Sequence, residues 1–488
     1  MPLSMLAEGQ TSKEKMRRAK IVATMGPATS SYEQIKAVIE AGVDVARMNL
    51  SHGSYEVHEA VYRNVRKAAE DAGKPVGVFV DLQGPKIRLG KFKDDIKYDL
   101  NKGDVFKITI DDILGDKDIC STTFQGLPGD VQPGDLLLID DGKVTLRATH
   151  VDATTVTTVC EIPGTVSNNK GINLPGVAVN VPALSEKDED DLRWGLKLGV
   201  DMIALSFVRN AADIKRVHEI MDEEGRRLPV IAKIEKPQAV AALEEIIDAF
   251  DGIMVARGDL GVELPFEEVP LVQKRAVELA RRWAKPVIVA TQMLETMTDN
   301  SRPTRAEVSD VANAILDGAD AVMLSGETSV GKWPVETVEA MARIIENTED
   351  NGLSRIPALG TRPHTHAGAV SLAAVEIAEL LGSRFVCVFT EGGDSMRRVS
   401  RLRSQVPVLA FTPNLDTQLR LSLVWGASTH LVGRVKHTDE MMGQVDEILL
   451  AKGLAKIGEE VVVVAGTPPG VAGSTNTLRV HRVGDQNH

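Results

Sequence analysis

Two short stretches place a lysine and two carboxylates where they could form one site. In VIAKIEKP, an apolar, strand-like run ends in Lys233 and Glu235, which alternate with Ile234 and so face the same side. Asp259 follows Glu235 by 24 residues, in DGIMVARGDLGVE, where the apolar run 252–256 breaks into glycine-rich sequence. Glycine lets the backbone approach a ligand closely. The pattern indicates two buried parallel strands with polar groups at their carboxyl ends.

These residue types suit phosphoryl chemistry with a hard divalent cation. Mg²⁺ usually takes one or two carboxylates from a protein and completes its shell with water and substrate oxygens. Glu235 and Asp259 would supply the carboxylates, and the ammonium of Lys233 would neutralise phosphoryl charge. The alternative is that Lys233 and Glu235 form a structural ion pair at a strand end.

Length and composition argue against several classes of protein. The chain has 488 residues, which exceeds a single hydrophobic core and predicts more than one domain. Its net charge of −13 argues against a nucleic-acid binder or an acidic-membrane binder. The 3 cysteines show no zinc or disulfide pattern, and no signal peptide or membrane span stands out. We expect a cytoplasmic protein.

The order of apolar runs predicts the domain organisation. Strand-like runs alternate with helical stretches through residues 19–84 and again through 183–350, which predicts an α/β fold of the TIM (β/α)8 barrel type. Residues 85–182 show period-two runs between PGD, DDG and LPG turns, typical of a small inserted all-β domain that resembles a barrel. Residues 363–488 predict a C-terminal α/β domain with the four strands RFVCVFT, VPVLAFT, STHLV and VVVVAG, and residues 1–18 a disordered extension.

Several further motifs occur in a fixed order. Besides the stretches above, the chain contains RMNLSHG, DLQGPKIR and VATQML. With this combination, from about residue 18 to the end, the chain resembles pyruvate kinase, a match far more specific than any single short motif. The resemblance implies transfer of the phosphoryl group of phosphoenolpyruvate to ADP, giving pyruvate and ATP, the last step of glycolysis. It also implies Mg²⁺ or Mn²⁺ as cofactor, a second Mg²⁺ arriving with ADP, and a homotetramer.

The resemblance also implies roles for individual residues. Lys233 and Arg47 would stabilise the transferring phosphoryl group, Arg47 by forking onto the phosphate. Thr291 would relay a proton to the enolate carbon through water, because threonine alone is too weak an acid. The other implied sites are the backbone amides of Gly258 and Asp259 for the substrate carboxylate, Asn49, His52, Arg88 and Lys170 for the nucleotide, and Asn49, Ser51 and Asp81 for a monovalent cation.

Some of these residues also have an interpretation that involves no ligand. A histidine in a turn, such as His52, is often simply hydrogen bonded, and Arg88 and Lys170 could be solvated surface charges. Closure of the inserted domain would bring Arg88 and Lys170 towards the nucleotide and exclude water from the phosphoryl group.

One motif departs from the family pattern. Potassium-dependent pyruvate kinases resemble DTKGPEIR where this chain reads DLQGPKIR, so Lys86 replaces a glutamate. The Lys86 ammonium could supply the charge that K⁺ brings beside phosphoenolpyruvate, and Asp81 could pair with it. The sequence thus predicts activity without K⁺. The alternative is that Lys86 points to solvent.

Glycine-rich loops in the C-terminal domain offer a candidate regulatory site. The loop TEGGDS carries Thr390, Gly393 and Ser395, and a second loop, GTPPGVAGSTN, spans 466–476. Such loops can be phosphate nests or ordinary turns. The resemblance implies a phosphorylated allosteric effector here, but Asp394 places an anion where a phosphate would lie and argues against a bisphosphate.

Two other functions are compatible with parts of this sequence. A metal-dependent aldolase or lyase that forms an enolate of pyruvate would use a similar barrel site without ADP. The inserted domain and the phosphate-directed basic residues argue against it. A catalytically silent sugar-phosphate sensor would not need Lys233, Asp259 and Thr291 together.

Overall fold

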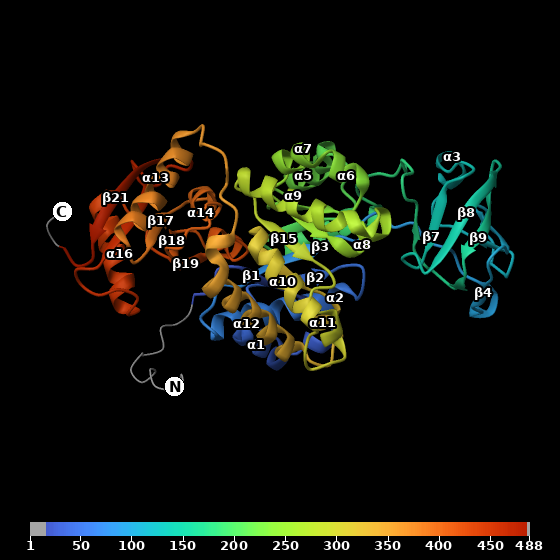
Figure 1. The fold of residues 1–488 in the computed structure, drawn as a ribbon, viewed down its shortest axis with the longest axis horizontal. Coiled ribbons are helices and arrows are strands. Elements are labelled where there is room, and N and C mark those ends of the chain that lie inside the picture. The colour runs from blue at the N-terminus through green and yellow to red at the C-terminus, as the bar shows by residue number, and fades with distance from the viewer. Residues whose placement is uncertain (1–15, 486–488) are drawn as a thin grey trace, which may run out of the picture.

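A closed barrel of parallel strands forms the centre of the molecule, as the sequence predicted (Figure 1). The structure is a computed structural model and describes residues 16–485. Around the barrel the strands run in the order β1-β16-β15-β14-β13-β12-β3-β2. Their bounds are β1 (Lys20–Met25), β2 (Val45–Asn49), β3 (Gly77–Asp81), β12 (Met202–Leu205), β13 (Val230–Ile234), β14 (Gly252–Ala256), β15 (Val287–Ala290) and β16 (Ala321–Leu324).

Helices surround this barrel and bury their apolar faces against it. Local sequence sets where they begin and end: α10 starts at a capping box between Thr304 and Glu307 and stops at Gly318, which has a φ of +96°. The helices are α1 (Tyr32–Ala41), α2 (Tyr55–Asp71), α4 (Glu186–Leu198), α5 (Ile214–Glu223), α6 (Pro237–Ala241), α7 (Leu243–Ala249), α8 (Arg257–Glu263), α9 (Val269–Arg282), α10 (Arg305–Asp317), α11 (Gly326–Ser329) and α12 (Pro334–Gly352).

A unit built mainly of β-strands is inserted between β3 and α4 and projects from the barrel on the side away from the C-terminal domain (Figure 1). Its larger sheet has the order β11-β7-β8-β9-β5-β6, and β10 pairs with β4. It has its own apolar core, which includes Phe106 and Leu146. The elements are β4 (Tyr98–Leu100), β5 (Val105–Thr109), β6 (Ile119–Ser121), α3 (Leu127–Asp130), β7 (Leu136–Ile139), β8 (Val144–Val151), β9 (Thr155–Ile162), β10 (Gly164–Val166) and β11 (Ile172–Asn173).

The C-terminal unit is a sheet of order β19-β18-β17-β20-β21 with helices packed on it. The sequence predicted four of these strands and missed β21, an edge strand antiparallel to β20 whose polar and partly exposed residues give a weak strand signal. The elements are α13 (His366–Leu381), β17 (Val386–Phe389), α14 (Asp394–Ser400), β18 (Val408–Thr412), α15 (Leu415–Leu421), β19 (Ala427–Leu431), α16 (Thr438–Ala451), β20 (Glu460–Gly466) and β21 (Thr475–Arg482).

Residues 1–15, most of the predicted N-terminal extension, lie outside the described residues. The residues that follow contact the barrel: Arg17 forms an ion pair with Asp44 at 2.7 Å, and the Arg18 amide donates to Glu349 at 2.9 Å. Within residues 16–485, no helix is both long enough and apolar enough to cross a membrane.

Candidate active site

Charged side chains from neighbouring strand ends meet at the carboxyl end of the barrel. Arg47 lies on β2, Asp81 ends β3 and Lys233 lies on β13. Arg47 Nε is 2.8 Å from Asp81 Oδ2, and Lys233 Nζ is 3.2 Å from Asp81 Oδ1. Lys233 Nζ is also 2.8 Å from Oε1 of Glu235, just beyond β13. Lys233 and Glu235 therefore lie together, as their alternation with Ile234 predicted.

Ser206 joins this cluster and was missed by the sequence analysis. It follows β12, and its hydroxyl accepts a hydrogen bond from Lys233 Nζ at 2.8 Å and donates to the Leu82 carbonyl at 2.7 Å. The available signal was its place directly after the apolar run MIAL, at a strand end like the other site residues. Ser206 fixes the position of the Lys233 ammonium between Asp81 and Glu235.

Burial and pairing set the charges of the cluster. Burial disfavours the charged form of Lys233, but the carboxylates of Asp81 and Glu235 outweigh burial and raise the Lys233 pKa above its usual value. Burial would likewise raise the pKa of Asp81, yet Lys233 and Arg47 hold it below its usual value. The lysine is therefore a fixed cation and Asp81 a fixed anion at neutral pH.

Glu235 and Asp259 are the two carboxylates predicted to hold a metal. Burial, followed by the negative charge of Glu235, raises the pKa of Asp259 to about 6, so the two side chains lie close enough to repel each other. Lys233 and Lys86 only partly offset this effect. Among residues 16–485 there is no cluster of three or more His, Cys, Asp or Glu side chains placed to hold a metal. Two repelling carboxylates fit Mg²⁺, which needs no more from a protein.

Thr291 and Gly258 are in direct contact beside this pair. The Gly258 amide donates to Thr291 Oγ1 at 2.7 Å, and the Thr291 hydroxyl donates to the Ala290 carbonyl at 2.6 Å. Thr291 has a φ of +68°, a strained conformation for a threonine, and Arg257 holds its carbonyl at 2.7 Å. A substrate carboxylate at the Gly258 amide would replace the hydrogen bond to Thr291.

The predicted cation and nucleotide residues of RMNLSHG lie at the end of β2 and on the turn that follows it. Asn49 faces Asp81 in the strand register, and its Oδ1 accepts from the Ser51 amide at 3.2 Å. His52 is exposed, and its carbonyl accepts a hydrogen bond from the His58 ring at 2.6 Å. The His52 side chain is thus open to a ligand.

The predicted nucleotide-binding residues of the inserted unit, Arg88 and Lys170, have partners within that unit. Lys170 forms an ion pair with Asp140 at 3.1 Å, and Arg88 donates to the Asn169 carbonyl at 3.0 Å. The suggested pairing of Asp81 with Lys86 is wrong. Asp81 is buried between Arg47 and Lys233, whereas Lys86 is exposed beyond the end of β3.

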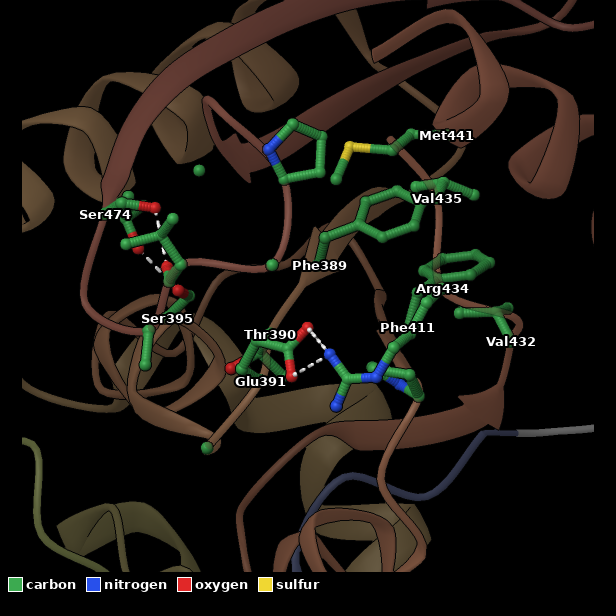
Figure 2. A pocket seen from close by; sticks show the side chains of 18 of the residues that line it. Phe389, Thr390, Glu391, Ser395, Phe411, Val432, Arg434, Val435, Met441 and Ser474 are labelled. Carbon is green, nitrogen blue, oxygen red and sulfur yellow. Dashed lines mark hydrogen bonds and ion pairs between the residues drawn. The ribbon is translucent and has the colours of Figure 1, made fainter. Parts of the chain in front are cut away.

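A second candidate site is a cavity of about 370 Å³ in the C-terminal unit (Figure 2). Thr390 and Ser395 line it, and Gly393, with a φ of +90°, donates its amide to Thr390 Oγ1 at 2.9 Å. The predicted anion is present, because Asp394 also lines the cavity and pairs with Arg398 at 2.6 Å.

Aromatic and charged side chains complete this cavity. Phe389 and Phe411 lie against each other with ring centroids 5.0 Å apart. Glu391 forms an ion pair with Arg434 at 3.3 Å across the cavity (Figure 2). The carboxylate of Glu391 therefore already neutralises one of the basic groups that line it.

The fold and the site together define a barrel protein with a lysine, an arginine and carboxylates gathered at the carboxyl ends of its strands. The family model "Pyruvate kinase, barrel domain" matches residues 16–338, and "Pyruvate kinase, alpha/beta domain" matches residues 368–481. The chain belongs to the pyruvate kinase family and is a phosphotransferase.

Relatives agree over almost the whole chain. A pyruvate kinase of Corynebacterium glutamicum is 57% identical over 96% of this chain and 98% of its own length. A pyruvate kinase of Mycobacterium tuberculosis is 54% identical over 96% of this chain and 99% of its own. The crystal structure of a pyruvate kinase from Cryptosporidium parvum superposes with a TM-score of 0.90 at 32% identity, covering 96% of each chain.

Proposed function

We propose that the chain transfers the phosphoryl group of phosphoenolpyruvate to ADP, giving pyruvate and ATP, at the buried cluster around Lys233. The observation that carries this proposal is the shared environment of Lys233, which contacts Asp81, Glu235 and Ser206 while Arg47 pairs with the same aspartate. Fixed cations beside two mutually repelling carboxylates can hold a metal and an anionic substrate together.

Glu235 and Asp259 would hold Mg²⁺, or Mn²⁺ in its place. When bound, the cation neutralises charge that develops on the phosphoryl and enolate oxygens. The chain prepares this position by keeping Glu235 buried and oriented, since its Oε2 accepts from the Phe207 amide at 2.7 Å. Burial, followed by the negative charge of Glu235, raises the pKa of Asp259, and a cation bound here would oppose both effects.

The remaining roles follow from position. Lys233 and Arg47 stabilise the transferring phosphoryl group, and the amides of Gly258 and Asp259 bind the substrate carboxylate. Thr291, once released from the Gly258 amide, can pass a proton through water to the enolate carbon. Such reactions depend mainly on positioning and on stabilising charge.

The nucleotide would lie between the barrel and the inserted domain. His52 and Asn49 would contact it from the barrel, while Arg88 and Lys170 would reach it from the inserted domain. Lys170 must exchange its ion pair with Asp140 for a phosphate, and this exchange is feasible because the Lys170 side chain is 36% exposed. The inserted domain would act as a lid that excludes water.

The decisive experiment is whether the purified protein makes ATP from phosphoenolpyruvate and ADP with Mg²⁺. An aldolase or lyase would use the barrel site without ADP, and a silent sensor would make no product. Formation of ATP therefore supports only the phosphotransferase. Its absence in a folded preparation with Mg²⁺ would overturn the proposal.

Lys86 supports activity without K⁺. Its ammonium acts on the site, because it is among the charges that lower the pKa of Asp259. Two unit charges about 4 Å apart at an effective dielectric of about 20 repel by about 4 kcal/mol, so a closure that brought Lys86 beside the pocket would disfavour K⁺ there. Asn49, Ser51 and Asp81 would then remain as an oxygen-lined pocket that needs no ion, with Asp81 satisfied by Arg47 and Lys233.

We therefore expect appreciable activity in potassium-free buffer with a bulky organic cation, and a new potassium requirement in Lys86→Glu. The measurement is the initial rate against K⁺ concentration for both proteins. A fall of more than about tenfold on removing K⁺ from the unmutated protein, about 1.4 kcal/mol of transition-state stabilisation, would contradict the role of Lys86.

The cavity of Figure 2 is proposed as an allosteric site for a phosphorylated effector held by Thr390, Gly393 and Ser395. Because Asp394 and Glu391 bring negative charge, a ligand with one phosphate fits better than a bisphosphate. A sugar monophosphate that binds here should shift the half-saturating phosphoenolpyruvate concentration, and Ser395→Asp should remove the shift. A response unchanged in this variant would place the effector elsewhere.

We also propose that the protein is a homotetramer in the cytoplasm. A dihedral tetramer needs two separate interfaces, and large apolar side chains are exposed both on the barrel, at Phe266 and Leu271, and on the C-terminal domain, at Leu380 and Ile457. The unpaired cysteines suit a reducing compartment. Light scattering at micromolar concentration tests the assembly, and a monomeric mass would exclude it.

A further inference from the structure

A buried carboxylate joins the inserted domain to the barrel beside the candidate metal ligands. Glu263 Oε1 accepts a hydrogen bond from Asn173 Nδ2 at 2.9 Å and lies 2.6 Å from Lys236 Nζ. Asn173 ends β11 of the inserted domain, whereas Lys236 and Glu263 belong to the barrel. The Glu263 side chain is 2% exposed, so both contacts are shielded from water. We call these three residues the interdomain clamp.

The clamp is continuous with the segments that carry the two carboxylates. Lys236 directly follows Glu235, and Glu263 lies one helical turn after Asp259 on α8. The ion pair between Lys236 and Glu263 therefore ties the end of β13 to the end of α8. Because this ion pair holds the two segments together, it limits how far Glu235 and Asp259, which repel each other, can move apart.

A second path leads from the clamp to Glu235 through Phe207. Lys236 Nζ lies 5.2 Å from the centre of the Phe207 ring, within range of a cation–π interaction. The Phe207 amide donates to Glu235 Oε2 at 2.7 Å, and this residue has a φ of +55°. A Cβ on Gly84, in the segment that leads into the inserted domain, would come within 2.5 Å of the Phe207 ring. Phe207 is thus held between the inserted domain and the metal site.

We propose that Glu263 is a positioning residue that couples the placement of the inserted domain to the spacing of Glu235 and Asp259. This inference rests on the proposed function, because it takes these two carboxylates as the Mg²⁺ ligands. When Asn173 binds Glu263, the carboxylate and Lys236 are fixed and the metal ligands are preorganised. When the inserted domain moves away, Glu263 loses one of its two donors and the spacing relaxes.

The test uses Mn²⁺ binding to the full-length protein without substrate, measured by electron paramagnetic resonance. Asn173→Ala removes the interdomain hydrogen bond and leaves every barrel residue unchanged. We expect its Mn²⁺ dissociation constant to rise about fivefold, since a buried hydrogen bond to a charged group is among the stronger ones. The matched control is Asn168→Ala, which removes hydrogen bonds to Asp95 and to the Phe92 amide, both inside the inserted domain.

A double-mutant cycle separates coupling from general loosening of the fold. Lys236→Met should weaken Mn²⁺ binding on its own. In the double variant, the Mn²⁺ dissociation constant should rise by less than the product of the two single-variant increases, because both donors act on Glu263 Oε1. Independent effects that multiply would overturn the coupling. Glu263→Gln keeps the side-chain shape and should bind Mn²⁺ as weakly as the double variant.

The failure of this inference can be told apart from failure of the metal site. If Asp259→Ala abolishes Mn²⁺ binding while Asn173→Ala and Asn168→Ala both bind it normally, the clamp does not position the ligands and the inference is overturned. If Asp259→Ala binds Mn²⁺ normally, the metal site itself is misassigned and the inference falls with it. A selective loss in Asn173→Ala supports both.

Discussion

Lys233→Met should abolish ATP formation from phosphoenolpyruvate and ADP while leaving exchange of solvent protons into bound pyruvate. The lysine is assigned to phosphoryl transfer, where its fixed positive charge stabilises the transferring group, and Thr291 is assigned to proton transfer. We expect a loss of at least about a thousandfold in ATP formation, about 4 kcal/mol of barrier. Methionine keeps a similar length in the buried site without the charge.

The measurement compares ATP formation with deuterium incorporation into pyruvate in the same preparation. Because Lys233 neutralises Asp81 and Glu235, its removal leaves buried charges unpaired, so circular dichroism and thermal unfolding must show an intact fold. Lys67→Met is the matched control, since Lys67 forms an exposed ion pair with Asp71 on α2, on the outside of the barrel. Loss of both reactions in a folded Lys233→Met protein would mean that the two roles are not divided in this way.

The barrel and the position of its site were predictable because they depend on local sequence. Each barrel strand is a short apolar run, and parallel strands bring their carboxyl ends to one edge whatever the loops do. Lys233, Glu235 and Asp259 therefore had to lie near one another once the barrel was inferred. The missed strand β21 carries polar residues on the edge of its sheet, where burial no longer imposes an apolar pattern.

Pairings between distant segments were not predictable in this way. Nothing in the sequence near Asn173 indicates a partner at Glu263, because the contact depends on how the inserted domain docks on the barrel. The sequence suggested Lys86 as the partner of Asp81 because the two residues are close in the chain. The structure instead gives it Arg47 and Lys233, which point into the barrel from adjacent or nearby strand ends. Ion pairs follow side-chain direction more than sequence separation.

Asp259→Ala should raise the Mg²⁺ concentration needed for activity and lower the rate by at least about a hundredfold. That loss corresponds to about 2.7 kcal/mol of transition-state stabilisation. The variant should nevertheless fold at least as well as the unmutated protein at pH 7. The pKa of Asp259 is raised to about 6, so the folded state binds a proton at this group more readily than the unfolded state does. Above pH 6 the ionised carboxylate therefore opposes folding, and its removal should leave the midpoint of thermal unfolding unchanged or higher.

The same raised pKa gives the expected pH dependence, and one set of titrations measures it. A metal ligand must be ionised, so Mg²⁺ affinity of the unmutated protein should fall as the pH drops through about 6, where Asp259 takes up a proton. Asp259→Ala should lose this inflection together with most of the affinity. Glu278→Gln, which breaks an exposed ion pair with Arg282 on α9, is the control and should keep both. Near-normal turnover of Asp259→Ala at ordinary Mg²⁺ concentrations would remove Asp259 from the metal site.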